Sequence, residues 1–500
     1  MTVKLSYGRL KPVLFAYLAL PILVFFAGFL KFFIALPAAA AVCYGYYAAV
    51  KRRKEPGDTE KYIEITAARI AALCLIALLW SYLGGLNGFF YQSSDWPWRN
   101  AIYRDLVFNK WPVVYPQRNS ALVYYIGFWL VPSLPAKLLF AVSGSARLAW
   151  FAARMALWLW TAAGLLLVFL CLNIFLGAKS KLHQYLVPLI FIFFSGLDIV
   201  GCIVRGNLSF RLNTEIHLEW WADIIQYSSN TTQLFWVFNQ SVLTWLAVLC
   251  FINEKSPRNY LFIGISCLCC GPLPFIGLVI LMLAVWAAEL VKNIRAKTAA
   301  SLLKQTFCAE NVLILLLSFP PLAAYYLCNL TLGNSVENGS GFFMEMNMHN
   351  LAVYAVFAVL EAGIYILLVL PYNRKNPLFY AAAVSLAVIP FFKLGNTMDF
   401  CMRASIPALV VLCVMCTDTL LFRKKTTRPK KVAAAILASA MLLGAATPAV
   451  EIYRGVYNCV KYKTVRLAKQ DFNSIGDLDE AGNFTAEDYN LKFFFKYFSR

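Results

Sequence analysis

Polar side chains with the potential for chemistry gather just beyond the apolar stretch Ile65–Leu86. Asp95 follows this stretch after a few helical turns' worth of chain, so its carboxylate would lie just outside the hydrocarbon, where lipid headgroups meet water. A base at that depth could remove a proton from a substrate bound at the membrane surface. Arg99 and Asp105 follow in the same loop. A solvated loop with a belt of aromatic side chains such as Trp111 is the alternative interpretation.

A second polar group precedes and enters a later apolar stretch. It contains the charged or titratable residues Arg205, Arg211, His217 and Glu219, and the amide of Gln240 follows inside the stretch. Amides at such positions commonly cap or solvate helix ends. They could also hold the hydroxyl groups of a sugar.

A third group contains Lys393, Asp399 and Arg403. Asp399 and Arg403 are four residues apart, so they share one face if the segment is helical. One interpretation is a local ion pair that locks two helices together. The other makes Arg403, with Lys393 nearby, a clamp for a phosphate or pyrophosphate at the membrane surface.

Metal and nucleotide sites have no recognisable pattern in this sequence. The 14 cysteines lie mostly within apolar stretches, and the three histidines are far apart. Neither arrangement has the spacing of metal ligands. No phosphate-binding loop, dinucleotide-binding or kinase motif occurs. We therefore assign no metal site and no cofactor, and whether a divalent metal takes part stays open.

The composition indicates a polytopic membrane protein. Of the 500 residues, 61% are hydrophobic and only 14% are charged, and the mean hydropathy is +0.64. Soluble domains carry about a quarter charged residues, so the bilayer is the expected environment. The net charge of +20 resides largely in short loops between apolar stretches. This is the positive-inside pattern, and it does not indicate a nucleic-acid partner.

The apolar stretches predict an all-α protein with about thirteen membrane spans. Every strongly basic loop falls on one side if residues 121–140, which contain two prolines, form re-entrant or interfacial helices in the first large outer loop. Tyr185–Val204 is expected to span once, and residues 260–290 to form a tight hairpin turning at Gly271. The N-terminus is then cytoplasmic and the Asp95 loop extracytoplasmic.

Three parts of the chain are distinguished. Residues 1–50 form an N-terminal transmembrane hairpin, and residues 62–450 form the transmembrane core that carries the polar groups. Residues 451–500 are expected to be a short extracytoplasmic tail, an amphipathic appendage too small to bury much core. Deleting residues 476–500 is expected to leave measurable activity.

Residues 85–160 carry a resemblance to a known family. The first loop contains DWPWRNAIYRDLVFNKWPVVY, followed by ALVYYIGFWL and then by ARLAWFAARM. This order of an acid after an apolar span, an Arg-rich amphipathic stretch, a Trp-Pro-x-x-Tyr turn and a re-entrant aromatic segment resembles the GT-C glycosyltransferases. These enzymes use polyprenyl-phosphate sugars, as in protein O-mannosyltransferases and aminoarabinose transferases. Many members carry two adjacent acids, whereas here Trp96 follows Asp95.

The resemblance implies a GT-C-like core that moves a sugar from a polyprenyl-phosphate donor to a hydroxyl of a glycan, lipid or protein acceptor, with inversion, at the outer face of the cytoplasmic (inner) membrane. Asp95 would be the catalytic base. Four cations would bind the donor phosphate: Arg403, Lys393, Arg205 and Arg211. Six residues would contact substrate: Arg99, Asp105, Glu219, His217, Gln240 and Asp399.

A transporter or flippase of a lipid-linked glycan is the rival hypothesis. It would also need many spans, charged cavities and a basic cytoplasmic face. A transporter is expected to place its charges near the bilayer midplane on broken helices. The main polar groups lie instead near one interface, while the break at Gly271 favours the transporter.

Cysteine-accessibility labelling should test this topology. Cysteines at Asp95, Arg211, Asp399 and the tail should react from one side of the membrane, and those at Lys54 and Lys425 from the other, because basic loops stay cytoplasmic. Labelling of positions 95 and 54 from the same side would contradict the whole topology.

Overall fold

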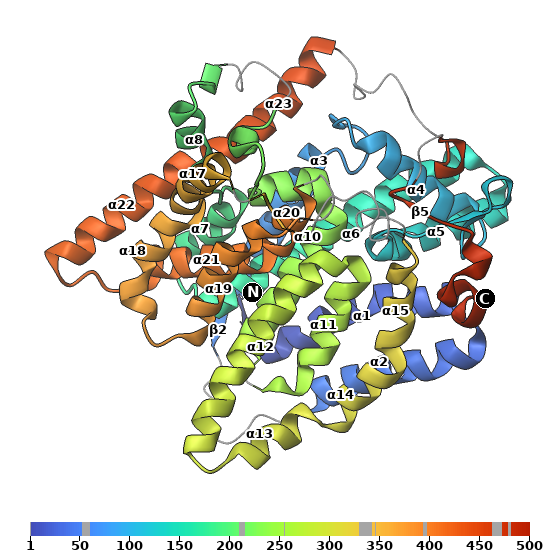
Figure 1. The fold of residues 1–500 in the computed structure, drawn as a ribbon, viewed down its shortest axis with the longest axis horizontal. Helices are drawn as coiled ribbons and strands as arrows, with labels where there is room; N and C mark the ends of the chain where they lie inside the picture. Colours follow the sequence, from blue (N-terminus) through green and yellow to red (C-terminus); the bar gives the residue numbers. More distant parts are fainter. Residues whose placement is uncertain are drawn as a thin grey trace.

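The protein is almost entirely helical in the computed structural model, which describes residues 2–52, 61–209, 216–254, 256–329, 343–345, 347–393, 398–462, 473–478 and 482–500. Two small antiparallel sheets complete the described fold (Figure 1). The predicted phosphate ligand Arg211 lies outside the described residues.

The elements of the first half are β1 Thr2–Ser6, α1 Tyr7–Phe29, α2 Phe32–Lys51, β2 Tyr62–Thr66, α3 Ala67–Leu83, α4 Trp96–Phe108, β3 Val114–Tyr115, β4 Ser120–Leu122, α5 Gly127–Ser143, α6 Ala146–Leu176, α7 Lys181–Ile192, α8 Asp198–Val204 and α10 Asn230–Asn253. Those of the second half are α11 Tyr260–Cys270, α12 Pro272–Arg295, α13 Ala299–Thr306, α14 Ala309–Leu313, α15 Phe319–Leu327, α17 Met348–Phe357, α18 Ile364–Asn373, α19 Pro377–Val388, α20 Asp399–Ala404, α21 Ile406–Thr417, α22 Arg428–Gly444, α23 Ala446–Tyr462 and β5 Thr485–Glu487.

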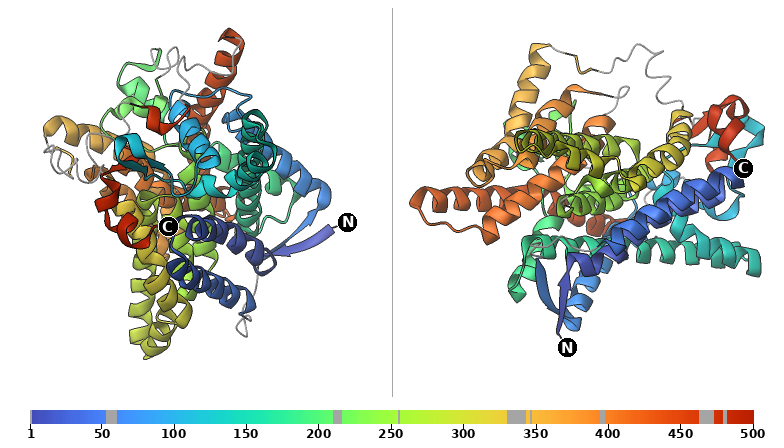
Figure 2. Two further views of the ribbon diagram at one scale, coloured as in Figure 1. Left: turned by 90° about the vertical axis from the view of Figure 1, so that its right-hand side faces the viewer. Right: turned by 90° about the horizontal axis from the view of Figure 1, so that it is seen from below.

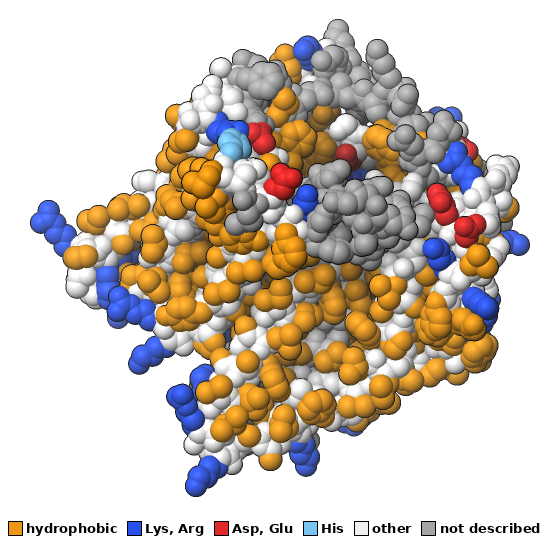
Figure 3. Space-filling view, viewed as in Figure 1, with side chains coloured by type: hydrophobic (Ala, Val, Ile, Leu, Met, Phe, Trp, Pro, Cys, Tyr) orange, Lys and Arg blue, Asp and Glu red, His pale blue; other side chains and the backbone are white. Residues whose placement is uncertain are grey.

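Several helices are long and apolar enough to cross a membrane, which confirms a multi-pass α-helical membrane protein. The described chain contains 8 such helices, and four shorter apolar helices accompany them. The predicted count of about thirteen spans is therefore not supported. Apolar side chains cover most of the surface in Figure 3, and Lys and Arg side chains line its lower-left edge. The Asp and Glu side chains visible in that view all lie in its upper half.

The predicted single span Tyr185–Val204 is wrong, because the structure breaks it into α7 and α8. The chain leaves the helix after Phe193 and resumes at Asp198. Within the break, the backbone of Gly196 passes so close to Glu361 that a Cβ at position 196 would lie 1.6 Å from the carboxylate Oε2. This contact with a distant segment sets the break, so the local apolar pattern does not reveal it.

The turn at Gly271 separates α11 from α12, as the sequence predicts. Gly271 has an extended backbone, and Pro272 begins the new helix. The two helices then lie side by side (Figure 1). With 11 residues, α11 is too short to count among the membrane-crossing helices, whereas α12 is one of them.

A two-stranded ribbon joins the starts of α1 and α3. Strand β1 pairs antiparallel with β2, and each strand runs directly into a helix capped by a hydroxyl. Ser6 Oγ accepts from the Arg9 amide, and Thr66 Oγ1 accepts from the Arg69 amide. Each arginine also folds back to donate to a carbonyl of its own strand. The ribbon therefore fixes the beginnings of both helices at one end of the bundle.

The first loop contains the helices expected there, α4 and α5, and also a small sheet. Strand β4 pairs with β3 on one side and with β5 of the C-terminal segment on the other. Residues 120–122 are therefore a strand, and the apolar helix begins only at Gly127. Helix α5 packs along α6 and against α4 (Figure 2).

The C-terminal segment is built into the first loop and is not a peripheral appendage. Besides the β4–β5 pairing, the Asp105 carboxylate accepts from the Ile475 amide at 2.9 Å and from the Tyr115 hydroxyl at 2.6 Å. Ser499 also bridges to Leu30 at the α1–α2 turn. Helix α23 runs across the expected start of the tail at residue 451.

Replacing Asp105 with alanine should destabilise the fold and free the tail. The buried Ile475 amide and Tyr115 hydroxyl would each lose an acceptor, and each unsatisfied donor costs about 1–3 kcal/mol. Thermal unfolding in detergent should show the loss, and limited proteolysis should cut residues 482–500 faster. Glu64→Ala, at an exposed carboxylate, is the control. Unchanged stability of Asp105→Ala would show that Asp105 does not hold the tail in place.

Candidate functional site

Two of the three polar groups found in the sequence meet in space. We use the name Asp95–Arg403 site for Asp95, Arg99, Tyr124, Tyr125, Asp399 and Arg403, which come from the first loop and from α20. The two segments are about 300 residues apart in the chain, so a helical fold must bring them together.

Asp95 and Arg99 form one ion pair of this site. Asp95 precedes α4, which begins with a proline near its first position, and Arg99 Nη2 lies 2.8 Å from Asp95 Oδ2 one turn later. The carboxylate is half exposed, with 52% of its side chain accessible, whereas Arg99 keeps only 9%. Arg99 also donates to the Phe235 carbonyl of α10. Arg99 is therefore held in place by a second contact, whereas the Asp95 carboxylate is accessible to solvent.

Arg403 and Asp399 form the second ion pair, as the four-residue spacing predicts. Their closest nitrogen and oxygen are 3.0 Å apart, and only 12% of the Arg403 side chain is accessible. The guanidinium lies 5.7 Å from the centre of the Tyr125 ring. Its Nε is buried and has no hydrogen-bond partner among the residues that the structure describes. An unsatisfied buried donor on a cation is costly, and an anionic oxygen would relieve that cost.

Tyr124 shows that the two pairs belong to one site. Burial raises the pKa of its hydroxyl, the charges of Arg403 and Arg99 lower that pKa, and the charges of Asp399 and Asp95 raise it. All four charges therefore act on one ring. Burial similarly raises the pKa of the neighbouring Tyr125 to about 12. Two neutral phenols thus line a site that carries two cations and two carboxylates.

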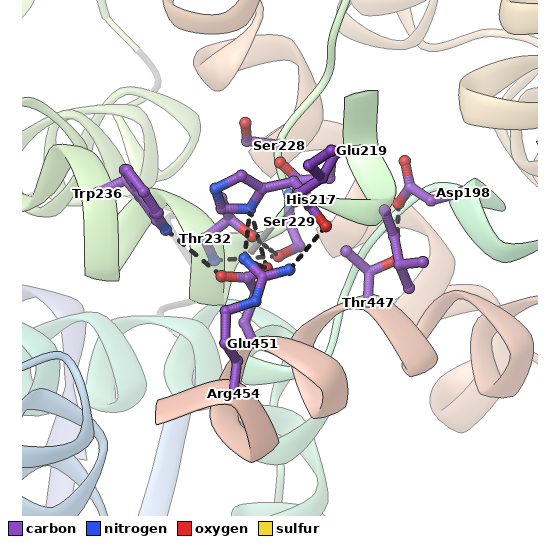
Figure 4. Close-up of polar contacts among 12 residues, drawn as sticks. Asp198, His217, Glu219, Ser228, Ser229, Thr232, Trp236, Thr447, Glu451 and Arg454 are labelled. Atoms are coloured by element: carbon purple, nitrogen blue, oxygen red, sulfur yellow. Dashed lines mark hydrogen bonds and ion pairs between the residues drawn. The ribbon is translucent and has the colours of Figure 1, made fainter. Parts of the chain in front are cut away.

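A second group of polar side chains, the buried polar cluster, consists of His217, Trp236, Glu451 and Arg454 (Figure 4). His217 Nδ1 is 2.9 Å from Glu451 Oε1, and Arg454 Nη1 is 3.0 Å from the same oxygen. Trp236 of α10 donates to the other oxygen of Glu451 at 3.4 Å. All three charged or titratable side chains are less than 10% accessible. The cluster thus joins α23 to α10 and to the segment before α10.

Glu219 lies in the same region and is almost fully buried. Its two oxygens accept from the Ser229 amide and from the Gln226 side chain, each at 2.8 Å. Burial, reinforced by the negative charge of Asp198, raises the pKa of Glu219 to about 8. The carboxyl group is therefore protonated near neutral pH.

Asp198 and Glu361 form a contacting pair of buried acids. Asp198 Oδ2 accepts from Ser195 at 2.8 Å and from Thr447 at 2.9 Å, while Glu361 Oε1 accepts from Trp221 at 2.9 Å. Among the described residues, the remaining oxygen of each acid is buried and receives no hydrogen bond from a third residue. Two carboxyl groups in contact avoid repulsion by sharing one proton.

A small cavity of ≈ 10 Å³ separates the buried polar cluster from the first loop. It is lined by Ser93 and Trp96 of the first loop, by Trp236, and by Glu451 and Arg454. This volume suits about one water molecule, which the polar lining could bind. The buried polar cluster and the Asp95–Arg403 site are therefore close neighbours along the first turns of α10.

The other residues predicted for substrate lie apart from Asp95. Arg205 forms an ion pair with Asp223 at the surface. The Asp105 carboxylate accepts a hydrogen bond from the Ile475 amide of the C-terminal segment. Gln240 is fully buried in α10 near Gly271, and neither of its amide atoms has a partner. No ion pair involving Lys393 occurs in the part of the chain that the structure describes.

Glu361, Glu451 and Arg454 are not among the site residues predicted from the sequence. Glu361 interrupts an apolar stretch, and an acid inside a span is itself a signal of a polar partner. Glu451 and Arg454 are three residues apart at the end of the last apolar stretch, where the predicted tail begins. Their spacing could have indicated a shared helix face, but not the partner His217.

No protein-family model, curated protein or solved structure matches this chain. In the described residues, no group of three or more His, Cys, Asp and Glu side chains is placed to hold a metal ion. What the fold and the site define is thus a class, a multi-pass α-helical membrane protein with two neighbouring polar assemblies.

The protonated state of Glu219 should make stability depend on pH. Its pKa in the folded protein, about 8, exceeds the value of 4.5 expected when unfolded. The folded state therefore binds more protons in this window, and stability should fall as the pH rises from about 4.5 to 8, by up to about 1.4 kcal/mol per pH unit.

Glu219→Gln, which stays neutral, should flatten this dependence in thermal unfolding curves. Gln226→Glu is not suitable as a control because it adds a buried charge. Glu487→Gln, at an exposed position, is the matched control. An equal pH slope in Glu219→Gln and in the unmodified protein would show that Glu219 is ionised in the fold.

Proposed function

We propose that this chain is a GT-C-type glycosyltransferase that moves a sugar from a polyprenyl-phosphate donor to an acceptor hydroxyl in the cell envelope. The observation that carries the proposal is the meeting of a half-exposed carboxylate, Asp95, with a buried cation, Arg403, that has a free donor. These are the two groups that an inverting transfer from a lipid phosphate requires.

In the proposed reaction, Asp95 accepts the proton of the acceptor hydroxyl as that oxygen attacks the anomeric carbon. The bond from the anomeric carbon to the phosphate oxygen breaks, and the lipid phosphate leaves with the bonding electrons. Arg403 stabilises the negative charge that this phosphate gains, because a guanidinium can bind two of its oxygens at once. Attack opposite to the leaving group inverts the anomeric carbon.

The existing ion pairs bear on this mechanism. Arg99 forms an ion pair with Asp95, and its own contact with the Phe235 carbonyl fixes the position of the pair. Asp399 neutralises part of the charge of Arg403 when no donor is bound. The phenols of Tyr124 and Tyr125 could donate hydrogen bonds to the phosphate or sugar, since both stay protonated.

The location of the site follows from the same proposal. The basic loops would face the cytoplasm, and the Asp95–Arg403 site would open on the outer face of the cytoplasmic membrane, together with the C-terminal segment. The sugar, the acceptor and the length of the lipid are not specified by these residues. Lys393 and Arg205 would guide an anionic donor toward Arg403.

A lipid-linked-glycan transporter is the second candidate, and one observation favours it. The Asp198–Glu361 pair lies buried inside the bundle, and buried acids of this kind mark proton relays in transporters. Glu361→Gln should then abolish transport into proteoliposomes, while Asp95→Asn should leave transport intact. If the protein is a glycosyltransferase, Asp95→Asn should strongly impair sugar transfer in a transfer assay, while Glu361→Gln should leave it intact.

The catalytic proposal should be tested with purified protein and radiolabelled polyprenyl-phosphate sugars. Asp95→Asn should reduce turnover by roughly 10²–10⁴-fold while donor binding survives, because the amide cannot accept the proton. Asp418→Asn is the matched control, since Asp418 also pairs with an arginine, Arg423, but at a distant position. Full activity of Asp95→Asn would refute the mechanism.

The same assay separates two roles for Arg403. Arg403→Ala should weaken donor binding as well as turnover, and Arg403→Lys should restore only part, since an ammonium lacks the two-pronged geometry. If Arg403 serves only to pair with Asp399, then Asp399→Asn should reproduce the loss seen in Arg403→Ala, and both variants should unfold at lower temperature.

A further inference from the structure

A cavity in the described structure lies far from the Asp95–Arg403 site. Its volume is ≈ 980 Å³. It is lined by the first residues of α1 and by the last residues of α2, α6, α10 and α12. The other end of α1 contacts the C-terminal segment beside the first loop. A helix of 23 residues is about 35 Å long, so the cavity and the first loop lie at opposite ends of the bundle.

The cavity carries an excess of positive charge. Five cationic side chains line it, against two carboxylates. The cations are Lys4, Arg9, Lys11, Arg52 and Lys61. One carboxylate, Glu254, is already bound by Lys11 at 2.8 Å. The other, Glu289, is bound by Lys292 outside the lining. Arg52 is paired with Glu310.

Lys4, Arg9 and Lys61 have no carboxylate partner among the described residues. Lys4 Nζ lies 4.7 Å from the centre of the Tyr62 ring. Arg9 donates to the Lys4 carbonyl at 2.6 Å, and Lys61 donates to the Phe175 carbonyl at 2.8 Å. Glu64 is the strand partner of Lys4 in the β1–β2 ribbon but forms no ion pair with it in the described structure, so none of the three positive charges is neutralised by a directly bound carboxylate. Cations do commonly satisfy the carbonyl ends of helices, and Lys61 does so for α6, but Lys4 and Arg9 lie at the start of a helix.

Apolar and aromatic side chains form the rest of the lining. Phe175, Ile252, Tyr260 and Trp286 contribute from four different helices. Strand β1 supplies Lys4, strand β2 supplies Tyr62, and Lys61 directly precedes β2. The paired ribbon therefore fixes the backbone at Lys4 and next to Lys61. A ligand that matches this lining has an anionic head and an apolar part.

We propose that this cavity binds the phosphate headgroup of an anionic phospholipid, with Lys4, Arg9 and Lys61 as the principal ligands. Clefts between helix ends with clustered basic side chains bind such headgroups at the cytoplasmic surface. The bound phosphate would compensate the three unpaired charges, while the acyl chains would follow the apolar lining toward the bilayer. The site rests on the cavity alone and is independent of the proposed glycosyl transfer.

Lipid-dependent thermal unfolding should test this proposal. The purified protein would be measured in neutral detergent with added phosphatidylglycerol, phosphatidylcholine or inorganic phosphate. The triple variant K4Q/R9Q/K61Q removes the three ligands. The triple variant K375Q/K424Q/K431Q removes the same charge from exposed positions outside the cavity lining and is the matched control.

Phosphatidylglycerol should stabilise the unmodified protein and the control variant more than phosphatidylcholine does. The K4Q/R9Q/K61Q variant should bind phosphatidylglycerol on the order of a hundredfold more weakly, since each basic residue near an anionic surface contributes about 1 kcal/mol. If inorganic phosphate stabilises equally and through the same three residues, the ligand is a soluble phosphate. Equal stabilisation of both triple variants by phosphatidylglycerol would overturn the proposal. If K4Q/R9Q/K61Q does not fold, K61Q alone should show a smaller loss in the same assay.

Discussion

The arrangement of both polar assemblies depends on how the polar start of α10 satisfies its hydrogen bonds inside an apolar bundle. A bilayer offers no water to these groups, so each must find a partner in the protein. Asn230 and Thr231 donate to carbonyls at the end of α7, and the side chain of Gln233 donates to the Ser228 carbonyl. Asn239 donates to the Tyr125 carbonyl in the first loop. These bonds fix α7, the segment before α10, and the first loop relative to one helix.

The helix itself changes course between these partners. Val237 has non-helical backbone angles, φ −137° and ψ 35°, so the turns before and after it face different directions. Before the kink, Trp236 binds Glu451 of the buried polar cluster. After it, Asn239 faces the Tyr125 side of the Asp95–Arg403 site. One irregular residue thus lets a single helix serve two assemblies.

Some of this arrangement follows from the sequence, for reasons that concern the membrane. The alternation of basic and apolar segments predicts that Asp95 and Arg403 lie at the same end of the bundle. Residues at the same depth in the bilayer are more easily brought close together. The Asp399–Arg403 pair follows from helical spacing alone. The first feature depends on the depth of each residue in the membrane, and the second depends on the spacing of residues along one helix. Both can be predicted from the order of residues in the sequence.

The remainder depends on partners that are distant in the chain. Asp105 and His217 have the residue types of a substrate site, yet their oxygens and nitrogens contact Ile475 and Glu451, more than 200 residues away. The break after Phe193 likewise arises where Glu361 meets Gly196. Nothing in the local pattern distinguishes a polar side chain that awaits a ligand from one that already holds another part of the protein.

The pairing of β4 with β5 has a consequence for biosynthesis. Residues 120–122 leave the ribosome long before residues 485–487, and all the intervening helices must enter the membrane first. Until then, β4 presents an unpaired edge, and Asp105 has no Ile475 amide to bind. The first loop can therefore reach its final form only after the rest of the bundle has been inserted, so a chain halted during insertion would expose an incomplete loop to quality-control proteases.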